Sequence, residues 1–105
     1  MICLGIESTA HTFGCGIIYD KGKVYANVTD AYKTETGGIH PSEAKKHHEE
    51  VKDKVVEDAL RNANLAMKDI DLISFSQGPG IAPCLLVGMK KAKELAHKLN
   101  IPLVG

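Results

Sequence analysis

Long hydrophobic runs are missing from this sequence. No apolar stretch approaches the roughly 20 residues that a membrane-spanning helix requires. The first apolar stretch, residues 2–6, has no basic leader before it, and Glu7 follows it directly. A secretory signal combines a basic leader with a longer apolar core and a cleavage site, so we expect neither a secretory signal nor a membrane partner.

Cysteine is also scarce, and its three copies form no recognisable pair. Cys3, Cys15 and Cys84 are widely spaced and make no Cys-x-x-Cys motif. This pattern is typical of reduced thiols, and we therefore expect a cytoplasmic protein without a disulfide framework. Cys3 and Cys15 fall in predicted strands and Cys84 in the first turn of a predicted helix. Because no base partner can be identified for a nucleophilic thiol, we expect all three to be packing residues.

An excess of charge of one sign is absent too. Thirteen basic and 13 acidic residues give a formal net charge of zero. Nucleic-acid binding by an isolated domain usually requires a basic surface. If RNA is the substrate, other parts of the protein must therefore supply the positive charge.

What is present is a globular composition with a clear order of elements. Hydrophobic residues make up 44% and charged residues 25% of the 105 residues, which suits one compact unit. The apolar pattern predicts strands at residues 2–6, 13–19, 24–29, 70–76 and from 101, and helices at 42–66 and 82–99. This βββαβαβ order predicts an α/β fold with helices packed on a mixed sheet. It is the order of the ribonuclease-H-like first subdomain of the actin-like ATPase (ASKHA) fold, and we expect residues 1–105 to be a truncated, first part of such a domain.

Both predicted helices are amphipathic. In the first, which has a possible break near residues 62–64, Val51, Val55 and Ala59 recur at helical spacing. Such a stripe suits packing inside the protein as well as a contact with a partner, and we expect it to be exposed as a partner interface. In the second helix, the predicted apolar face consists of Leu85, Leu86, Met89, Ala92, Leu95, Ala96 and Leu99.

Two polar turns follow predicted strands, at the sheet edge where open α/β sheets bind ligands. The first contains Glu7, Ser8, Thr9 and His11, whose hydroxyls and backbone N–H groups suit a phosphate and whose carboxylate suits Mg²⁺. The second, Gly78-Pro79-Gly80, opens a helix whose amino terminus favours an anion. The alternative stays open that Ser8 and Thr9 only satisfy turn backbone and that the second segment is only a tight turn.

The other histidines give weaker signals. His40, Glu43 and His47 lie near the start of the first predicted helix. Because nothing supplies a matched fourth ligand, a polar helix start with exposed histidines is favoured over a metal site. His97 lies near the end of the second predicted helix, where a cation suits the helix dipole, and we expect a structural role.

Three segments carry a resemblance to a known family. GIESTAHTFG, GGIHPSEAKKHH and GPGIAPCLLVGMKKAKELA resemble, in order, the archaeal and eukaryotic tRNA threonylcarbamoyladenosine-synthesis transferases. These are catalytic subunits of the KEOPS complex and relatives of bacterial TsaD. Their older label, O-sialoglycoprotein endopeptidase, finds no support in this sequence, which has neither an HExxH motif nor a catalytic triad.

The resemblance implies an acyltransferase that moves threonylcarbamoyl from threonylcarbamoyl-adenylate to a tRNA adenosine beside the anticodon. It implies ATP and Mg²⁺, together with iron or zinc whose ligands lie beyond Gly105, so no catalytic residue or metal ligand is assigned within residues 1–105. The implied partners are tRNA, bound through the full complex, a small dimerising subunit and a kinase subunit. The piece alone is expected to be inactive, since one wall of a cleft cannot hold a nucleotide.

Carried over residue by residue, the resemblance implies that Glu7, Ser8, Thr9 and His11 form the loop near the phosphates. Gly78, Pro79 and Gly80 match the turn that supports the same cleft, and the helix from Ser42 matches an insertion that contacts partner subunits. Bacterial relatives carry acidic residues where this chain has His11 and Thr12, which puts any acid–base role of those carboxylates in doubt here.

Two other functions remain open at this point. A non-catalytic actin-fold assembly module would use the stripe at Val51, Val55 and Ala59 to bind a partner. A sugar or acetate-type kinase shares the fold and its phosphate loops, and fold alone does not exclude it.

Overall fold

The computed structural model describes residues 1–19, 22–33 and 40–105. The elements, in chain order, are β1 (Ile2–Glu7), β2 (Thr12–Tyr19), β3 (Lys23–Ala31), α1 (Pro41–Ala63), the 3-10 helix η2 (Met67–Asp69), β4 (Leu72–Phe75), α2 (Ala82–Leu99) and β5 (Leu103–Val104). The predicted βββαβαβ order is thereby confirmed, with η2 as an unpredicted addition. The predicted loop at residues 34–40 lies outside the described residues except for His40.

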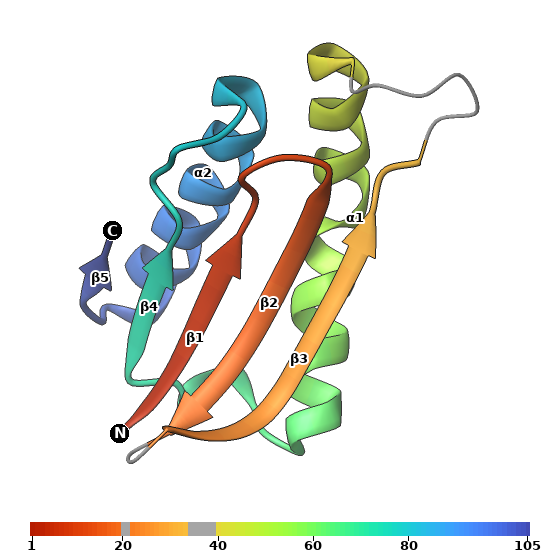
Figure 1. Cartoon of the computed structure of the whole chain (residues 1–105). Coiled ribbons are helices and arrows are strands. Elements are labelled where there is room, and N and C mark those ends of the chain that lie inside the picture. The colour runs from red at the N-terminus through yellow and green to blue at the C-terminus, as the bar shows by residue number, and fades with distance from the viewer. Residues whose placement is uncertain (20–21, 34–39) are drawn as a thin grey trace.

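The described strands form one mixed sheet in the order β3-β2-β1-β4-β5. β1 pairs antiparallel with β2, and β2 pairs antiparallel with β3, with a register shift at Ile17/Ile18. β4 lies parallel to both β1 and β5. Gly22 has a φ of 74° in the connection before β3, the left-handed conformation expected of a glycine in a tight turn. Consequently the carboxyl ends of β1, β4 and β5 lie at one edge of the sheet (Figure 1).

Both helices cover the same face of the sheet (Figure 1). α1 packs on β2 and β3, while α2 packs on β1, β4 and β5, and the two helices contact each other. The core lies between them and the sheet, and its largest fully buried apolar side chains are Phe13, Leu4, Ile17, Ile73 and Val87. Alternate residues of each strand supply this core, as the period of two along a strand requires.

The stripe on α1 is buried, which contradicts the predicted exposure of its residues. Ala59 is fully buried, Val55 is 3% exposed, and Val51 packs against the core. The reason is that β2 and β3 present apolar side chains that α2 does not reach, so α1 must cover them. Val51, Val55 and Ala59 therefore form no partner interface in this fold.

The buried face of α2 also differs from the predicted one. Ala92, Leu95 and Ala96 are buried as expected, but Leu86 is 47% exposed. The helix instead turns Cys84, Val87, Gly88 and Lys91 inward, because Gly88 lets α2 approach the end of β1 closely. Periodicity alone could not choose between these two faces, which differ by a small rotation of the helix.

The ends of α1 and β4 show how local hydrogen bonds set boundaries. α1 ends at Ala63 rather than at 66, because Asn64 adopts a left-handed φ of 57° and its N–H returns to the Arg61 and Leu60 carbonyls. η2 follows, with the Ala66 N–H donating to the Asp69 carboxylate at 2.8 Å. The predicted break near residues 62–64 is thus the end of the helix, and β4 begins only at Leu72.

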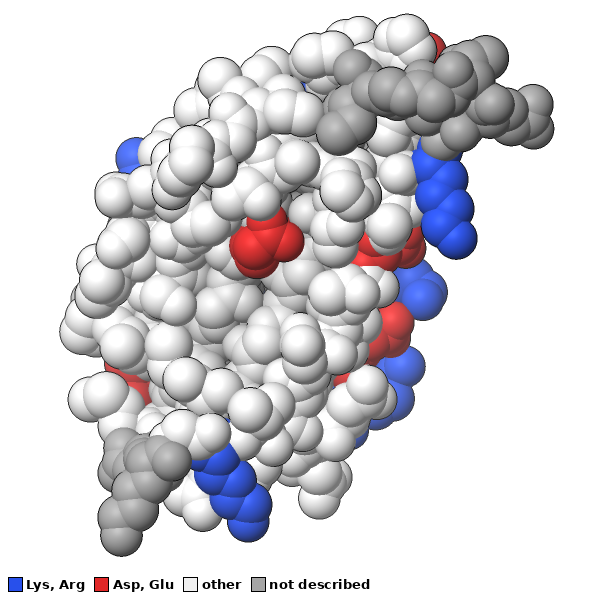
Figure 2. All heavy atoms as spheres, in the orientation of Figure 1, with Lys and Arg blue, Asp and Glu red and all other residues white. Residues whose placement is uncertain are grey.

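The opposite face of the sheet is covered by no helix within the described residues. Figure 2 views this face and shows its Lys and Arg side chains at the margins, with few charges in the centre. Small residues, including Gly5, Gly14 and Gly16, line a shallow cavity of about 500 Å³ there. The two faces of the sheet therefore have different surfaces, one packed by helices and one left flat.

Candidate functional site

The loop of residues 8–11 joins β1 to β2 at the edge where the parallel strands end. On one side it is attached to β4 and α2. The Ser8 N–H donates to Ser76 Oγ at 3.2 Å, and the Thr9 carbonyl accepts from the Ile81 N–H at 2.6 Å. Gly80 lies so close that an added Cβ would stand 2.3 Å from the Thr9 carbonyl oxygen. The structure therefore brings together the two turns that the sequence singled out.

On its other side the same loop is attached to α1 and to the segment after β3. The Ala10 carbonyl accepts from His48 Nε2 at 2.8 Å, and the His11 carbonyl accepts from the Tyr32 N–H at 2.6 Å. Three consecutive carbonyls, from Thr9 to His11, are thus engaged by donors from three different segments. A loop held at every residue keeps its shape without a ligand, which is the condition for a preorganised binding site.

The backbone N–H groups of this loop show a contrasting pattern. Those of Ala10 and His11 have no hydrogen-bond partner in the part of the chain that the structure describes. The amino terminus of α2 meets the same loop at Thr9, whose carbonyl accepts from the Ile81 N–H, and it contributes a partial positive charge. Free N–H groups next to a helix amino terminus are suited to an anion.

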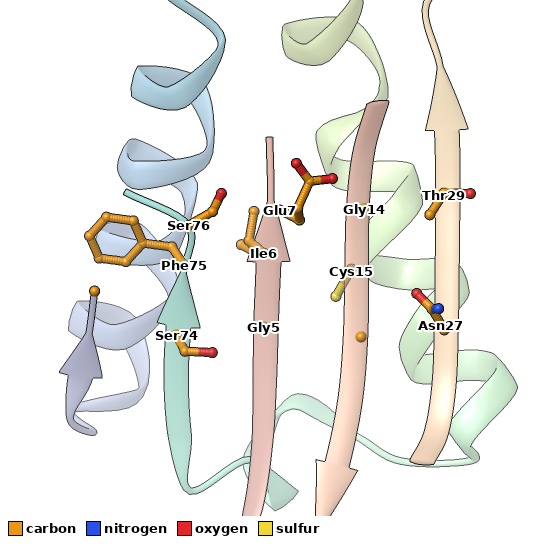
Figure 3. A pocket seen from close by; sticks show the side chains of 12 residues that line it. Gly5, Ile6, Glu7, Gly14, Cys15, Asn27, Thr29, Ser74, Phe75 and Ser76 are labelled. Atoms are coloured by element: carbon orange, nitrogen blue, oxygen red, sulfur yellow. The ribbon is translucent and has the colours of Figure 1, made fainter. Parts of the chain in front are cut away.

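Glu7 and Thr9 interact mainly with each other. Glu7 Oε1 accepts from the Thr9 N–H at 2.7 Å and from the Thr9 hydroxyl. The Thr9 side chain therefore satisfies the turn, as the alternative interpretation of this loop proposed. Glu7 Oε2 has no partner among the described residues, and the side chain is exposed. Figure 3 shows Glu7 at the end of β1, where it lines the cavity on the open face.

Ser8 has its hydroxyl turned into the protein. The residue is fully buried, and its Oγ has no hydrogen-bond partner among the described residues. An added Cβ on Gly88 would stand 2.1 Å from this oxygen, so Ser8 packs directly on α2. The predicted position of Ser8 in the loop is confirmed, but its side chain faces away from the surface where a phosphate would bind.

The cavity on the open face adjoins this loop. Figure 3 shows Ser74 and Ser76 from β4 and its end, and Asn27 and Thr29 from β3, around the glycines of β1 and β2. The lining thus combines glycines and polar side chains with the apolar Ile6 and Phe75, and Glu7 is its carboxylate. None of these residues except Glu7 was a sequence candidate. The signal that could have identified them is the run of glycines at alternate positions on adjacent strands.

A pair of histidines, His47 and His48, lies behind the loop, and the sequence predicted that His47 is exposed. His48 is fully buried, and its ring makes an edge contact with Phe13 at 5.7 Å between centroids. Burial lowers the pKa of His48 below its ordinary value. His47 has only 15% of its side chain exposed and lies 2.9 Å from the Asp30 carboxylate. The prediction was wrong for His47 because it ignored β3, whose end carries Asp30 onto this part of α1.

No described residues form a group of three or more side chains able to hold a metal ion. Glu43 instead accepts from the Tyr32 hydroxyl at 2.6 Å, while His40 remains exposed before α1. His97 lies exposed in the last turn of α2, where the sequence placed it.

The three thiols are packing groups. Cys15 and Cys84 are buried, and burial raises the pKa of Cys15 to about 12 and also raises the pKa of Cys84. Cys3 is half-buried, with its Sγ 3.5 Å from Ser74 Oγ. The sequence prediction is confirmed for Cys15 and Cys84, and the helix amino terminus does not activate Cys84 because desolvation outweighs it.

Neither described helix has the length and apolar character needed to cross a membrane.

Comparison with protein families identifies this chain. The family model described as TsaD, tRNA N6-adenosine threonylcarbamoyltransferase, matches residues 23–105. A tRNA N6-adenosine threonylcarbamoyltransferase of Thermococcus gammatolerans is 52% identical over all 105 residues, which cover 32% of that protein. A probable bifunctional tRNA threonylcarbamoyladenosine biosynthesis protein of Thermoplasma volcanium is 46% identical over the whole chain, which covers 20% of it. The chain thus spans about a third or less of these curated relatives.

Solved structures share the fold at low sequence identity. YeaZ from Pseudomonas aeruginosa superimposes with a TM-score of 0.77 at 17% identity, over 98% of this chain and 41% of YeaZ. RuvC from Thermus thermophilus gives a TM-score of 0.54 at 12% identity, over the whole chain and 64% of RuvC. These similarities support the predicted ribonuclease-H-like arrangement of the sheet and helices.

Proposed function

We propose a function from the premise that this chain belongs to the TsaD family of tRNA N6-adenosine threonylcarbamoyltransferases. The intact protein transfers threonylcarbamoyl from threonylcarbamoyl-adenylate to a tRNA adenosine. The N6 amine of the adenosine attacks the carbamoyl carbon and loses a proton. The bond from that carbon to the phosphate oxygen breaks, and adenylate leaves. The task for this chain is to hold the phosphate that carries the developing negative charge.

The observation that carries this proposal is the loop of residues 8–11, in which the carbonyls of Thr9 to His11 are engaged while the N–H groups of Ala10 and His11 have no partner among the described residues. The free N–H groups of Ala10 and His11 would donate to the phosphate of the leaving group. Because the loop is held in place beforehand, it would stabilise that charge without reorganising. The turn at Gly78, Pro79 and Gly80 would support the loop and bring the amino terminus of α2 to the same anion.

Glu7 would hold a magnesium ion beside the phosphates, directly or through water. Magnesium is usually bound by one or two carboxylates together with phosphate oxygens and water. One free oxygen on an exposed carboxylate at the edge of the loop fits that role. The iron or zinc that the family resemblance implies does not fit the described residues of this chain. Its ligands are proposed to lie beyond Gly105, and no step here is derived through it.

Other subunits and other parts of the protein would supply the remaining contacts. The chain has no net charge, so we propose that tRNA is bound by the assembled KEOPS-type complex, with its small dimerising subunit and kinase subunit. The buried stripe of α1 is not one of the contact surfaces. We further propose that these 105 residues alone are inactive.

Reconstitution tests the proposal. The intact protein that carries this chain, incubated with threonine, bicarbonate, ATP, tRNA and its partner proteins, should yield threonylcarbamoyl-modified adenosine, detected by mass spectrometry of digested tRNA. Absence of the modified nucleoside with metal-loaded, folded protein would count against the transferase. Tight binding of ATP by the 105 residues alone in calorimetry would contradict the division of the site between this chain and the rest of the protein.

A further inference from the structure

Two adjacent histidines link the loop of residues 8–11 to the end of β3. His48 Nε2 lies 2.8 Å from the Ala10 carbonyl oxygen, and His48 Nδ1 lies 2.9 Å from His47 Nδ1. His47 Nε2 in turn lies 2.9 Å from Asp30 Oδ1. The two outer groups, a carbonyl and a carboxylate, accept hydrogen bonds and donate none. This chain of three contacts therefore restricts where the protons lie.

The proton positions follow from that restriction. His48 must donate from Nε2 to the Ala10 carbonyl, and burial disfavours the charged form of this ring, which leaves its Nδ1 with a lone pair. That lone pair must accept from His47 Nδ1–H. His47 must also donate from Nε2 to the Asp30 carboxylate. All three hydrogen bonds exist together only when His47 carries both ring protons.

We propose that doubly protonated His47, held by Asp30, is a positioning residue that fixes His48 and thereby the loop that presents its N–H groups to phosphate. The inference rests on the proposed function for the assignment of phosphate to that loop. When His47 loses one proton as the pH rises, one contact must fail. Either Asp30 faces a bare ring nitrogen, or His48 Nδ1 does. Order in the loop, and with it affinity for phosphate, should fall with increasing pH.

Charged and titratable groups surround the pair from each element packed on it. α1 contributes Glu43, Lys46 and Glu50, which line the same shallow depression as His47, together with Tyr32 from the segment after β3. Glu7, at the end of β1, acts on His48 electrostatically, as does Asp30. Burial lowers the pKa of His48 by more than these two carboxylates raise it.

Nitrogen-15 NMR of the imidazole rings tests the proton positions directly in the 105-residue chain, since protonated and bare ring nitrogens resonate in separate ranges. With all three hydrogen bonds formed, His47 should show two protonated nitrogens and His48 a protonated Nε2 with a bare Nδ1. As the pH rises, His47 should lose one proton while the amide signals of Ala10 and His11 shift or broaden. A proton on His48 Nδ1 instead of Nε2 would overturn the inference.

Asp30→Asn separates positioning from simple packing. An amide can turn either its oxygen or its NH₂ group toward His47, so it can pair with both protonation states of the ring. The variant should fold normally and lose the pH dependence of the Ala10 and His11 signals. Asp58→Asn is the matched control, because Asp58 lies on α1 and pairs with Lys54 and Arg61. It should keep the pH dependence of the unmodified chain, and persistence of that dependence in Asp30→Asn would refute the inference.

The same variants in the intact protein distinguish this inference from the proposed function. Asp30→Asn should flatten the rise of KM for threonylcarbamoyl-adenylate with pH while kcat at the optimum stays close to that of the unmodified protein. If NMR shows the predicted ring protonation but reconstitution yields no modified nucleoside, the proposed transferase function is wrong and the positioning role of His47 stands. Full activity with an unchanged pH profile of KM in Asp30→Asn would contradict the positioning role alone.

Discussion

The loop of residues 8–11 is held from two sides by different means. On the α2 side the contacts are made by backbone, with Gly80 against the Thr9 carbonyl and Gly88 against Ser8. On the α1 side the contact is a buried side chain, His48, which reaches the Ala10 carbonyl. A backbone contact has no group that titrates and no space for a side chain, whereas an imidazole contact depends on protons. The comparison teaches that the contacts on the α2 side do not depend on pH, whereas the contact on the α1 side depends on the protonation of a histidine ring.

The largest loss is expected from Gly80→Ala. Its Cβ would stand 2.3 Å from the Thr9 carbonyl oxygen and 3.0 Å from Thr9 Cα, and backbone cannot rotate away. Overpacking of this kind should lower the free energy of unfolding by about 3 kcal/mol. Urea denaturation measures it, with Gly16→Ala as a control at a glycine whose Cβ position has no atom nearer than 3.8 Å. Equal stability of Gly80→Ala and the unmodified chain would show that the contact with α2 is loose.

On the α1 side, His48→Leu should cost somewhat less. The substitution leaves the Ala10 carbonyl without its donor in a buried position, which we expect to lower the free energy of unfolding by about 2 kcal/mol. His48→Gln should recover part of that loss, since its side-chain NH₂ can donate to the same carbonyl. Thermal unfolding of the two variants side by side is the measurement. If glutamine is no better than leucine, the ring contributes through packing on Phe13 rather than through its hydrogen bond.

Gly88→Ala tests the second backbone contact. The new Cβ would stand 2.1 Å from Ser8 Oγ but 3.0 Å from Ser8 Cβ, and the hydroxyl can rotate. We expect a loss of about 1.5 kcal/mol, near the low end for overpacked positions. In a double-mutant cycle, Ser8→Gly should restore much of the stability of Gly88→Ala, because the two groups compete for one space. Additive effects of the two substitutions would mean that the strain lies elsewhere.

The smallest effect, and the only gain, is expected from Ser8→Ala. This change removes a buried hydroxyl that has no hydrogen-bond partner among the described residues. Removing an unsatisfied polar atom should raise the free energy of unfolding by about 0.5 kcal/mol. If denaturation shows a clear loss of stability instead, Ser8 Oγ makes a hydrogen bond, for example with water, and the backbone contact on this side has a polar component.

Much of the fold was predictable from local pattern, and the candidate site only in part. Two loops that end strands of a predicted sheet were expected at one edge, and Thr9 and Gly80 do meet there. The direction of the Ser8 hydroxyl was not predictable, because it depends on how deeply α2 sits on β1. His48 lies at helical spacing from Val51 in the sequence, yet its hydrogen bond to Ala10 joins residues 38 apart.

The sequence by itself determined the order of the strands and helices, the glycine turns and the burial of Cys15 and Cys84, since these follow from short-range periodicity and backbone preference. The tertiary structure decided which face of each helix is covered. It buried the α1 residues Val55 and Ala59 against the sheet, left Leu86 exposed on α2, and placed Asp30 beside His47. The physical reason is that a helix buries the face that meets the apolar surface left uncovered by its neighbours. That surface is formed by other elements, so it cannot be predicted from the sequence of the helix alone.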